Sequence, residues 1–182
     1  MGICLNLRHA TAGALRRFTR DTSGSNAIQF ALVAVPFFAL IFATIETAMI
    51  FFATQAMETA TQDAARLIMT GQAQMQGMSA TTFKTQLCNR LSGVLDCANG
   101  LDVDVQSYSS FANVNINNPV SGGVYNNNTG YSAGHAGDIV VVRTFYQWPV
   151  FVTSLGYDPS NIGGNKRLIT ATAAFRNEPG PF

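Results

Sequence analysis

The sequence predicts an α+β protein with a long N-terminal transmembrane and stalk helix, a short second helix and a small antiparallel β-sheet domain. Three observations predict this class. Residues 27–53 include only two strongly polar side chains, Gln29 and Glu46. Helical periodicity continues this apolar run as far as Gly71. Beyond Gly100 the apolar residues change to the alternation typical of strands.

The apolar run is long enough to cross a lipid bilayer. About 20 residues at ~1.5 Å rise each cover the ~30 Å hydrocarbon core. The run exceeds the ~7–15 apolar residues of an ordinary secretory signal, and no Ala-x-Ala cleavage site follows it. We therefore expect a membrane-spanning helix.

Charge predicts the orientation of that helix. Arg8, Arg16, Arg17 and Arg20 precede it against a single acid, Asp21, and such arginines keep the adjoining end in the cytoplasm. We expect a cytoplasmic basic leader (1–24), a transmembrane and stalk helix (25–73) and an extracytoplasmic α+β domain (74–182). The net charge of the whole chain is +1, which gives no reason to expect nucleic acid as a partner.

The helix continues beyond the apolar run as a stalk. Apolar residues recur there at three-to-four spacing, at Met57, Ala60, Ala64, Leu67 and Ile68. A helix over about 26–70 is ~68 Å long, and Gly71 is its first plausible stop.

A second helix is predicted over 80–92. Ser79 can cap its N-terminus, and Gly93 suits the left-handed position after its C-terminus. Phe83, Leu87, Cys88 and Leu91 form its apolar stripe.

Cys88 and Cys97 lie on the outer side of the membrane, where an oxidising compartment allows a disulfide; free buried thiols are the alternative. The disulfide requires the helix to end near Gly93, because nine helical residues would separate the sulfurs by ~13 Å. A zinc site needs four ligands, and His135 is the only histidine in this part of the sequence. We expect no metal site.

Strands are predicted over 101–105, 138–148 and 168–175. In the first of these, Asp102, Asp104 and Gln106 alternate with apolar residues, which indicates a half-buried strand. Residues 113–134 contain seven Asn and five Gly or Pro, which indicates a long exposed loop with little to bury.

The sequence predicts neither an enzyme nor a cofactor. His135 and Asp138 could be drawn into a triad with a serine, but no nucleophile motif is present and His135 lies in a Gly-rich loop. No regular calcium loop or phosphate-binding glycine loop is found either.

The border between leader and apolar run, Gly24-Ser25-Asn26-Ala27-Ile28-Gln29-Phe30, resembles a class III signal peptide. Prepilin peptidases cut such leaders after a Gly, with Glu at the fifth residue beyond the cut and an aromatic residue at the sixth. The resemblance implies cleavage between Gly24 and Ser25, with Phe30 at the aromatic position. Gln29 departs from the pattern because it lacks the charge. The alternative is that Gly24 is a flexible hinge.

A wider resemblance covers the chain from about Gly24 to Pro179. An apolar helix with an early Pro36, the mid-helix Glu46 and the Ala64-Ala65-Arg66 extension resembles the TadE-like family, the pseudopilins of the tight-adherence (Tad or Flp) pilus system. Residues 101–105, 140–149 and 174–179 also resemble it.

This resemblance implies a non-enzymatic pseudopilin-like subunit in the assembly of a tight-adherence type IV pilus. The protein would lie in the bacterial inner membrane as a single-pass protein with a periplasmic C-terminal domain. The implied partners are major and minor pilins, the prepilin peptidase, the inner-membrane pilus platform and membrane lipid. The alternative is an uncleaved single-pass envelope protein whose outer domain binds a ligand or an envelope component.

Three residues are expected to contact neighbouring helices, namely Gln29, Phe30 and Glu46. A bare carboxylate inside a membrane costs ~3 kcal/mol or more, so Glu46 should be protonated or paired with a donor from another helix. The alternative is a neutral Glu46 bonded within its own helix. Pro36 either softens the helix or is simply tolerated there.

Overall fold

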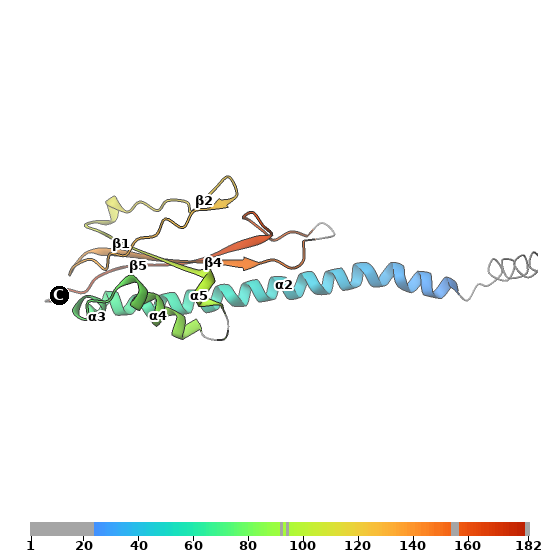
Figure 1. The fold of residues 1–182 in the computed structure, drawn as a ribbon, viewed down its shortest axis with the longest axis horizontal. Coiled ribbons are helices and arrows are strands. Elements are labelled where there is room, and N and C mark those ends of the chain that lie inside the picture. Colours follow the sequence, from blue (N-terminus) through green and yellow to red (C-terminus); the bar gives the residue numbers. More distant parts are fainter. Residues whose placement is uncertain (1–23, 92, 94, 154–156, 181–182) are drawn as a thin grey trace, which may run out of the picture. The chain divides into compact units, whose positions relative to one another are not determined.

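A computed structural model describes residues 24–91, 93, 95–153 and 157–180. It confirms the predicted α+β class, with a long N-terminal helix, short helices and a small antiparallel sheet (Figure 1). Residues 1–23 of the predicted leader lie outside the described residues. The chain divides into two compact units, Met1–Phe42 and Ala43–Phe182, and helix α2 contributes to both.

Helix α2 spans Gly24–Met69, close to the predicted 26–70. Good helix formers, Ala above all, fill it, and it continues through Pro36 without a break. The helix ends where predicted, because Gly71 adopts a left-handed φ of 74° and its N–H donates to the Ile68 carbonyl at 3.0 Å.

Burial changes along α2. None of residues 24–45 is buried. From Glu46 onward buried residues recur every three or four positions and define one covered face. They are Glu46, Ile50, Ala53, Met57, Ala60, Thr61, Ala64, Ala65 and Ile68.

The face is covered by a three-stranded antiparallel sheet with the order β1-β4-β5. Its strands are β1 (Leu101–Tyr108), β4 (Ile139–Pro149) and β5 (Lys166–Arg176), in agreement with the three predicted strands. The central strand β4 is buried over most of its length, which explains its nearly continuous apolar and aromatic sequence.

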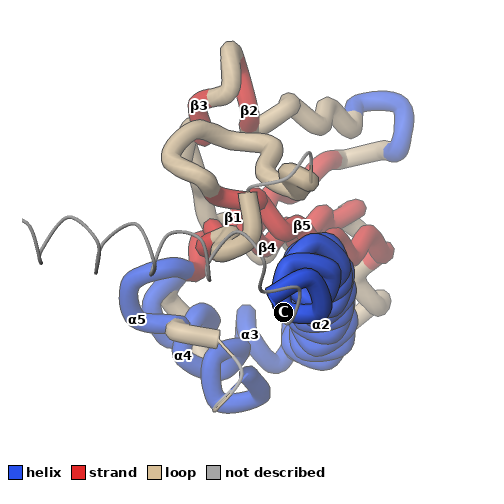
Figure 2. Tube along the Cα trace, turned by 90° about the vertical axis from the view of Figure 1, so that its right-hand side faces the viewer, coloured by secondary structure: helices blue, strands red, loops and turns tan. Residues whose placement is uncertain are grey.

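Helices and strands of the C-terminal unit form layers. Helices α3 (Gln72–Met75), α4 (Ala80–Leu91) and α5 (Cys97–Gly100) lie with the second half of α2 on one face of the sheet (Figure 2). The hairpin of β2 (Val120–Ser121) and β3 (Val124–Tyr125) lies on the opposite side. The main core between helices and sheet includes Met57, Ile68, Phe83, Leu87, Leu91, Val105, Val140, Val142 and Ile169.

The local structure around α4 follows the sequence closely. The Ser79 hydroxyl caps the helix by accepting the Thr82 N–H at 3.2 Å. The helix ends at Leu91, and Gly93 adopts a φ of 86°; Ser92, predicted as the last helical residue, lies outside the described residues. The chain then turns back, and Cys88 and Cys97 form a disulfide with their Cα atoms 5.6 Å apart.

Asp104 lies on the predicted polar face of β1, but that face is covered at this position and Asp104 is only 2% exposed. Arg143 donates to Asp104 Oδ2 through Nε (3.1 Å) and Nη2 (2.7 Å), while the Gly130 N–H and Gln106 Nε2 donate to Oδ1. Burial alone would raise the pKa of Asp104, but the hydrogen bonds from Gln106, Gly130 and Arg143 outweigh burial and hold the pKa below its ordinary value of 3.8.

The Asn-rich segment 113–134 covers this buried pair. Most of its residues are exposed, as predicted, but two tyrosines are half-buried. Tyr125 donates to Asp102 Oδ2 at 3.0 Å, and the Tyr131 ring packs 5.7 Å from the Phe83 ring. Arg143 also donates to the Asn117 carbonyl at 2.8 Å. The segment is therefore hydrogen-bonded to the sheet at several points, which its composition did not predict.

Candidate functional site

The first unit presents an apolar helix surface. Between residues 24 and 42 the large apolar side chains are exposed, and Phe30 reaches 73%. The set is Ile28, Phe30, Leu32, Val33, Val35, Phe37, Phe38, Leu40, Ile41 and Phe42. Soluble monomers rarely expose a continuous apolar surface of this kind. Helix α2 is long and apolar enough to cross a membrane.

The predicted cleavage and helix-contact residues of the N-terminal region lie on the first turns of α2. Gly24, Ser25, Gln29 and Phe30 are all exposed, and α2 begins at Gly24. Gln29 and Phe30 are therefore available to an external contact on the helix surface.

Glu46 is the first buried residue of α2, since none of residues 24–45 is buried. It is 5% exposed, and its Oε2 accepts the backbone N–H of Phe151 at 3.3 Å. Its Oε1 is buried and has no hydrogen-bond partner among the residues that the structure describes. One carboxyl oxygen is thus held by the connection between β4 and β5, and the other has no partner among the described residues.

The residue next to Glu46 makes a parallel contact. The Thr47 hydroxyl hydrogen-bonds the Tyr157 hydroxyl and also donates to the Ala43 carbonyl. Phe151 and Tyr157 both belong to the connection between β4 and β5. This connection therefore touches α2 at two successive residues, a contact that no local pattern in the sequence predicted. The only sequence signal was Pro149, which marks the end of β4.

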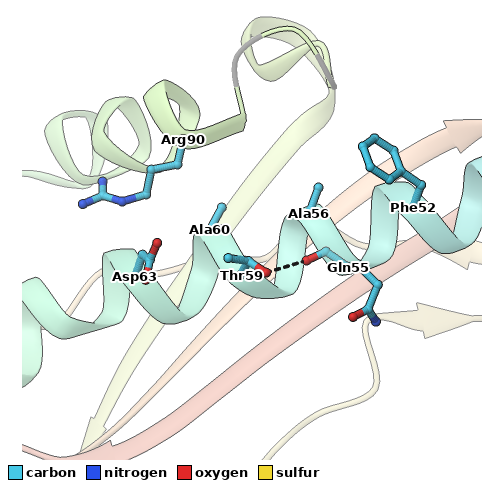
Figure 3. Close-up of a pocket in the computed structure, with 7 residues that line it drawn as sticks. All are labelled: Phe52, Gln55, Ala56, Thr59, Ala60, Asp63 and Arg90. Atoms are coloured by element: carbon cyan, nitrogen blue, oxygen red, sulfur yellow. Dashed lines mark hydrogen bonds between the residues drawn. The ribbon is translucent and has the colours of Figure 1, made fainter.

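A groove runs along α2 beside α4 (Figure 3). It is open and is lined by Phe52, Gln55, Ala56, Thr59, Ala60, Asp63 and Arg90. Figure 3 shows the small side chains Ala56 and Ala60 pointing into the space between the helices. Asp63 on α2 and Arg90 on α4 stand on opposite sides of one end. Small residues permit close approach of a further helix, and the two charges suit polar side chains on it.

His135 offers no catalytic arrangement in the described part of the chain. Its side chain is 91% exposed, and its ring Nδ1 lies 3.6 Å from Asp138 Oδ2. Its backbone N–H donates to the same carboxylate at 2.8 Å, which is an ordinary loop contact. The described residues contain no cluster of three or more His, Cys, Asp or Glu side chains suited to a metal ion.

Residues 24–66 match the model of a protein family described as TadE-like protein. The resemblance inferred from the sequence is thereby confirmed for this segment, about a quarter of the chain, which runs from Gly24 to Arg66 within α2. The match points to a role related to the tight-adherence pilus. No curated protein and no solved structure matches the chain.

Proposed function

We propose that this protein is a membrane-anchored, non-enzymatic pseudopilin-like subunit that serves assembly of a tight-adherence type IV pilus. The observation that carries the proposal is the TadE-like match at residues 24–66, which coincides with the exposed apolar part of α2 and its extension. An apolar helix surface of this kind needs lipid or other apolar helices around it.

Orientation and processing follow from the N-terminal sequence. The arginines before α2 favour a cytoplasmic N-terminus in the bacterial inner membrane and a periplasmic C-terminal domain. The prepilin peptidase removes the leader after Gly24 and leaves Ser25 as the new N-terminus. The family match begins at Gly24, which supports a boundary at this residue.

The mature helix packs with major and minor pilins and with the inner-membrane pilus platform. Gln29 and Phe30 are exposed and contribute contacts near the new N-terminus. Oε1 of Glu46 accepts a hydrogen bond from a neighbouring helix, since it is buried without a partner within the described residues. The groove between α2 and α4 receives the stalk of a neighbouring helix above the membrane.

Processing tests the proposal directly. The full chain is expressed with and without an active prepilin peptidase, extracted from membranes and analysed by intact mass and N-terminal sequencing. We expect a new N-terminus at Ser25 that depends on the peptidase. In a Gly24→Leu variant the leader should stay attached, because a bulky side chain replaces the one residue that passes freely through an extended protease cleft.

A full-length N-terminus in the presence of active peptidase would contradict the proposal. It would favour the rival, an uncleaved single-pass envelope protein with a ligand-binding outer domain.

Packing is tested separately by crosslinking to co-expressed pilins. Thr59→Trp fills the groove, so we expect weaker crosslinking, and Thr170→Trp on the exposed face of β5 serves as the matched control. Glu46→Leu should also weaken crosslinking. Unchanged crosslinking in both variants would contradict the contacts assigned to the groove and to Glu46.

A further inference from the structure

The segment that follows β4 reaches α2 at an unexpected level. Phe151 contacts Glu46 and Tyr157 contacts Thr47, although the apolar run continues to Ala53. Seven residues of helix correspond to ~10 Å along its axis. A part of the outer domain therefore lies beside the last two turns of the apolar run.

Several of the side chains exposed at this level are large and apolar. Phe51 is 66% exposed, Phe52 63% and Phe151 73%. We call these three residues the aromatic collar. The collar continues the exposed apolar surface of α2, since Ile45 and Met49 are also exposed at 49% and 46%. Between Arg143 and Asp158, the stretch that includes Phe151, the sequence contains no charged residue.

We infer that the aromatic collar lies at the outer interface of the bilayer, just beyond the hydrocarbon core, and that the outer domain rests on the membrane at Phe151. The occupant is lipid because the collar is continuous with the apolar surface of α2 and because aromatic rings favour the membrane interface. The inference rests on the membrane-spanning part of the proposed function. It places the boundary of the hydrocarbon core near Glu46. The Glu46 carboxylate then lies at this boundary, in contact with Phe151 of the outer domain.

The same arrangement explains how a carboxylate is accommodated there. A group at the membrane boundary costs less than one at the bilayer centre, and the Phe151 N–H supplies a donor at 3.3 Å. Contact with lipid also fixes the height of the domain above the membrane.

Tryptophan fluorescence in lipid vesicles tests the collar. The full chain carries Trp148→Phe to remove the native fluorophore and is reconstituted into phosphatidylcholine vesicles with bromine atoms at graded depths of the acyl chains. Three reporters are compared: Phe151→Trp in the collar, Phe38→Trp in the predicted span and Phe111→Trp as an aqueous control. Phe111 is a matched control because it is an aromatic residue of the outer domain with 67% exposure.

We expect shallow bromines to quench Phe151→Trp at least about twofold more than Phe111→Trp, since an interfacial ring meets only the upper acyl chains. Phe38→Trp should be quenched most by deep bromines. If Phe38→Trp is quenched but Phe151→Trp behaves like Phe111→Trp, the collar inference is overturned while the spanning helix stands. If Phe38→Trp escapes quenching, the spanning helix itself fails and the collar with it.

Discussion

The two halves of α2 are parts of one helix, yet they differ in which of their side chains are buried. Residues 30–42 are apolar on every side and none is buried. From Gln55 to Met69 apolar side chains concentrate on the covered face, and polar residues such as Gln55, Glu58 and Asp63 occupy other positions. A helix that is apolar all round requires an apolar solvent, whereas an amphipathic helix needs only one packed partner.

Helix formation and helix environment are therefore set separately in α2. Backbone hydrogen bonds and good helix formers carry α2 through both halves. The distribution of side chains decides whether lipid or the protein's own core surrounds each half. Substitutions can therefore disturb one half and leave the other intact.

The largest effect is expected in the outer domain, at the buried pair of Asp104 and Arg143. Asp104→Ala should lower the free energy of unfolding by about 3–4 kcal/mol, because it leaves the largely covered Arg143 guanidinium without its carboxylate partner. Denaturant unfolding in detergent, followed by Trp148 fluorescence, measures it. Membrane insertion should be unchanged, and Asp158→Asn, at an exposed carboxylate, is the control. An unfolding midpoint equal to that of the control would show that the pair does not stabilise the domain.

In the first half of α2, a substitution should impair membrane insertion rather than the stability of the domain. Phe38→Arg places a charge near the middle of the predicted span and should cost about 2.5–3.5 kcal/mol of insertion free energy. Membrane fractionation should show loss of the inserted form, while Phe38→Leu should behave like the wild type. If Phe38→Arg inserts as well as Phe38→Leu, residues 24–42 do not lie in lipid.

A smaller effect is expected where the second half of α2 meets β4. The hydroxyls of Thr61 and Thr144 hydrogen-bond at 2.8 Å, and both residues are buried. Thr61→Val should destabilise the domain by about 1–2 kcal/mol, because the Thr144 hydroxyl loses this partner. Adding Thr144→Val should recover part of the loss, which a double-mutant cycle measures. Strictly additive losses would argue against a direct bond between α2 and the sheet.

The smallest effect is the pH dependence that Asp104 contributes. Its pKa is lower in the folded state than the ordinary value of 3.8, so the folded state favours the ionised form. The contribution is complete above the ordinary value and is lost as pH falls through the lowered folded pKa. Unfolding midpoints measured from neutral pH down to strong acid should fall less steeply for Asp104→Asn than for the wild type. Parallel curves would remove Asp104 as a source of acid sensitivity.

Local patterns predicted most of the fold. The periodicity of α2, the Ser79 cap and the alternation in β1 each depend on residues close together in the sequence. The turn at Gly93 could be foreseen because the Cys88–Cys97 disulfide requires it.

Contacts between distant segments could not be predicted, because they join residues that lie far apart in the sequence. Alternation in β1 placed Asp104 on the polar face correctly, but it carries no information about what covers that face. The covering residues, Asn117 and Gly130, lie in a segment whose composition indicates only a loop. Likewise, Glu46 and Phe151 are 105 residues apart in the sequence, so the apolar run alone could not reveal that the outer domain reaches the helix there.

We infer that α2 passes from lipid into a protein core near Glu46. A nitroxide side chain placed in turn at each position from 28 to 68, in full-length protein carrying Cys4→Ser and reconstituted in vesicles, tests it most directly. Collision with oxygen should be high at every position before Glu46. Beyond it, accessibility should oscillate with the helical period and reach minima at Ile50, Met57 and Ala64. High accessibility to a water-soluble nickel complex throughout residues 28–45 would contradict the account.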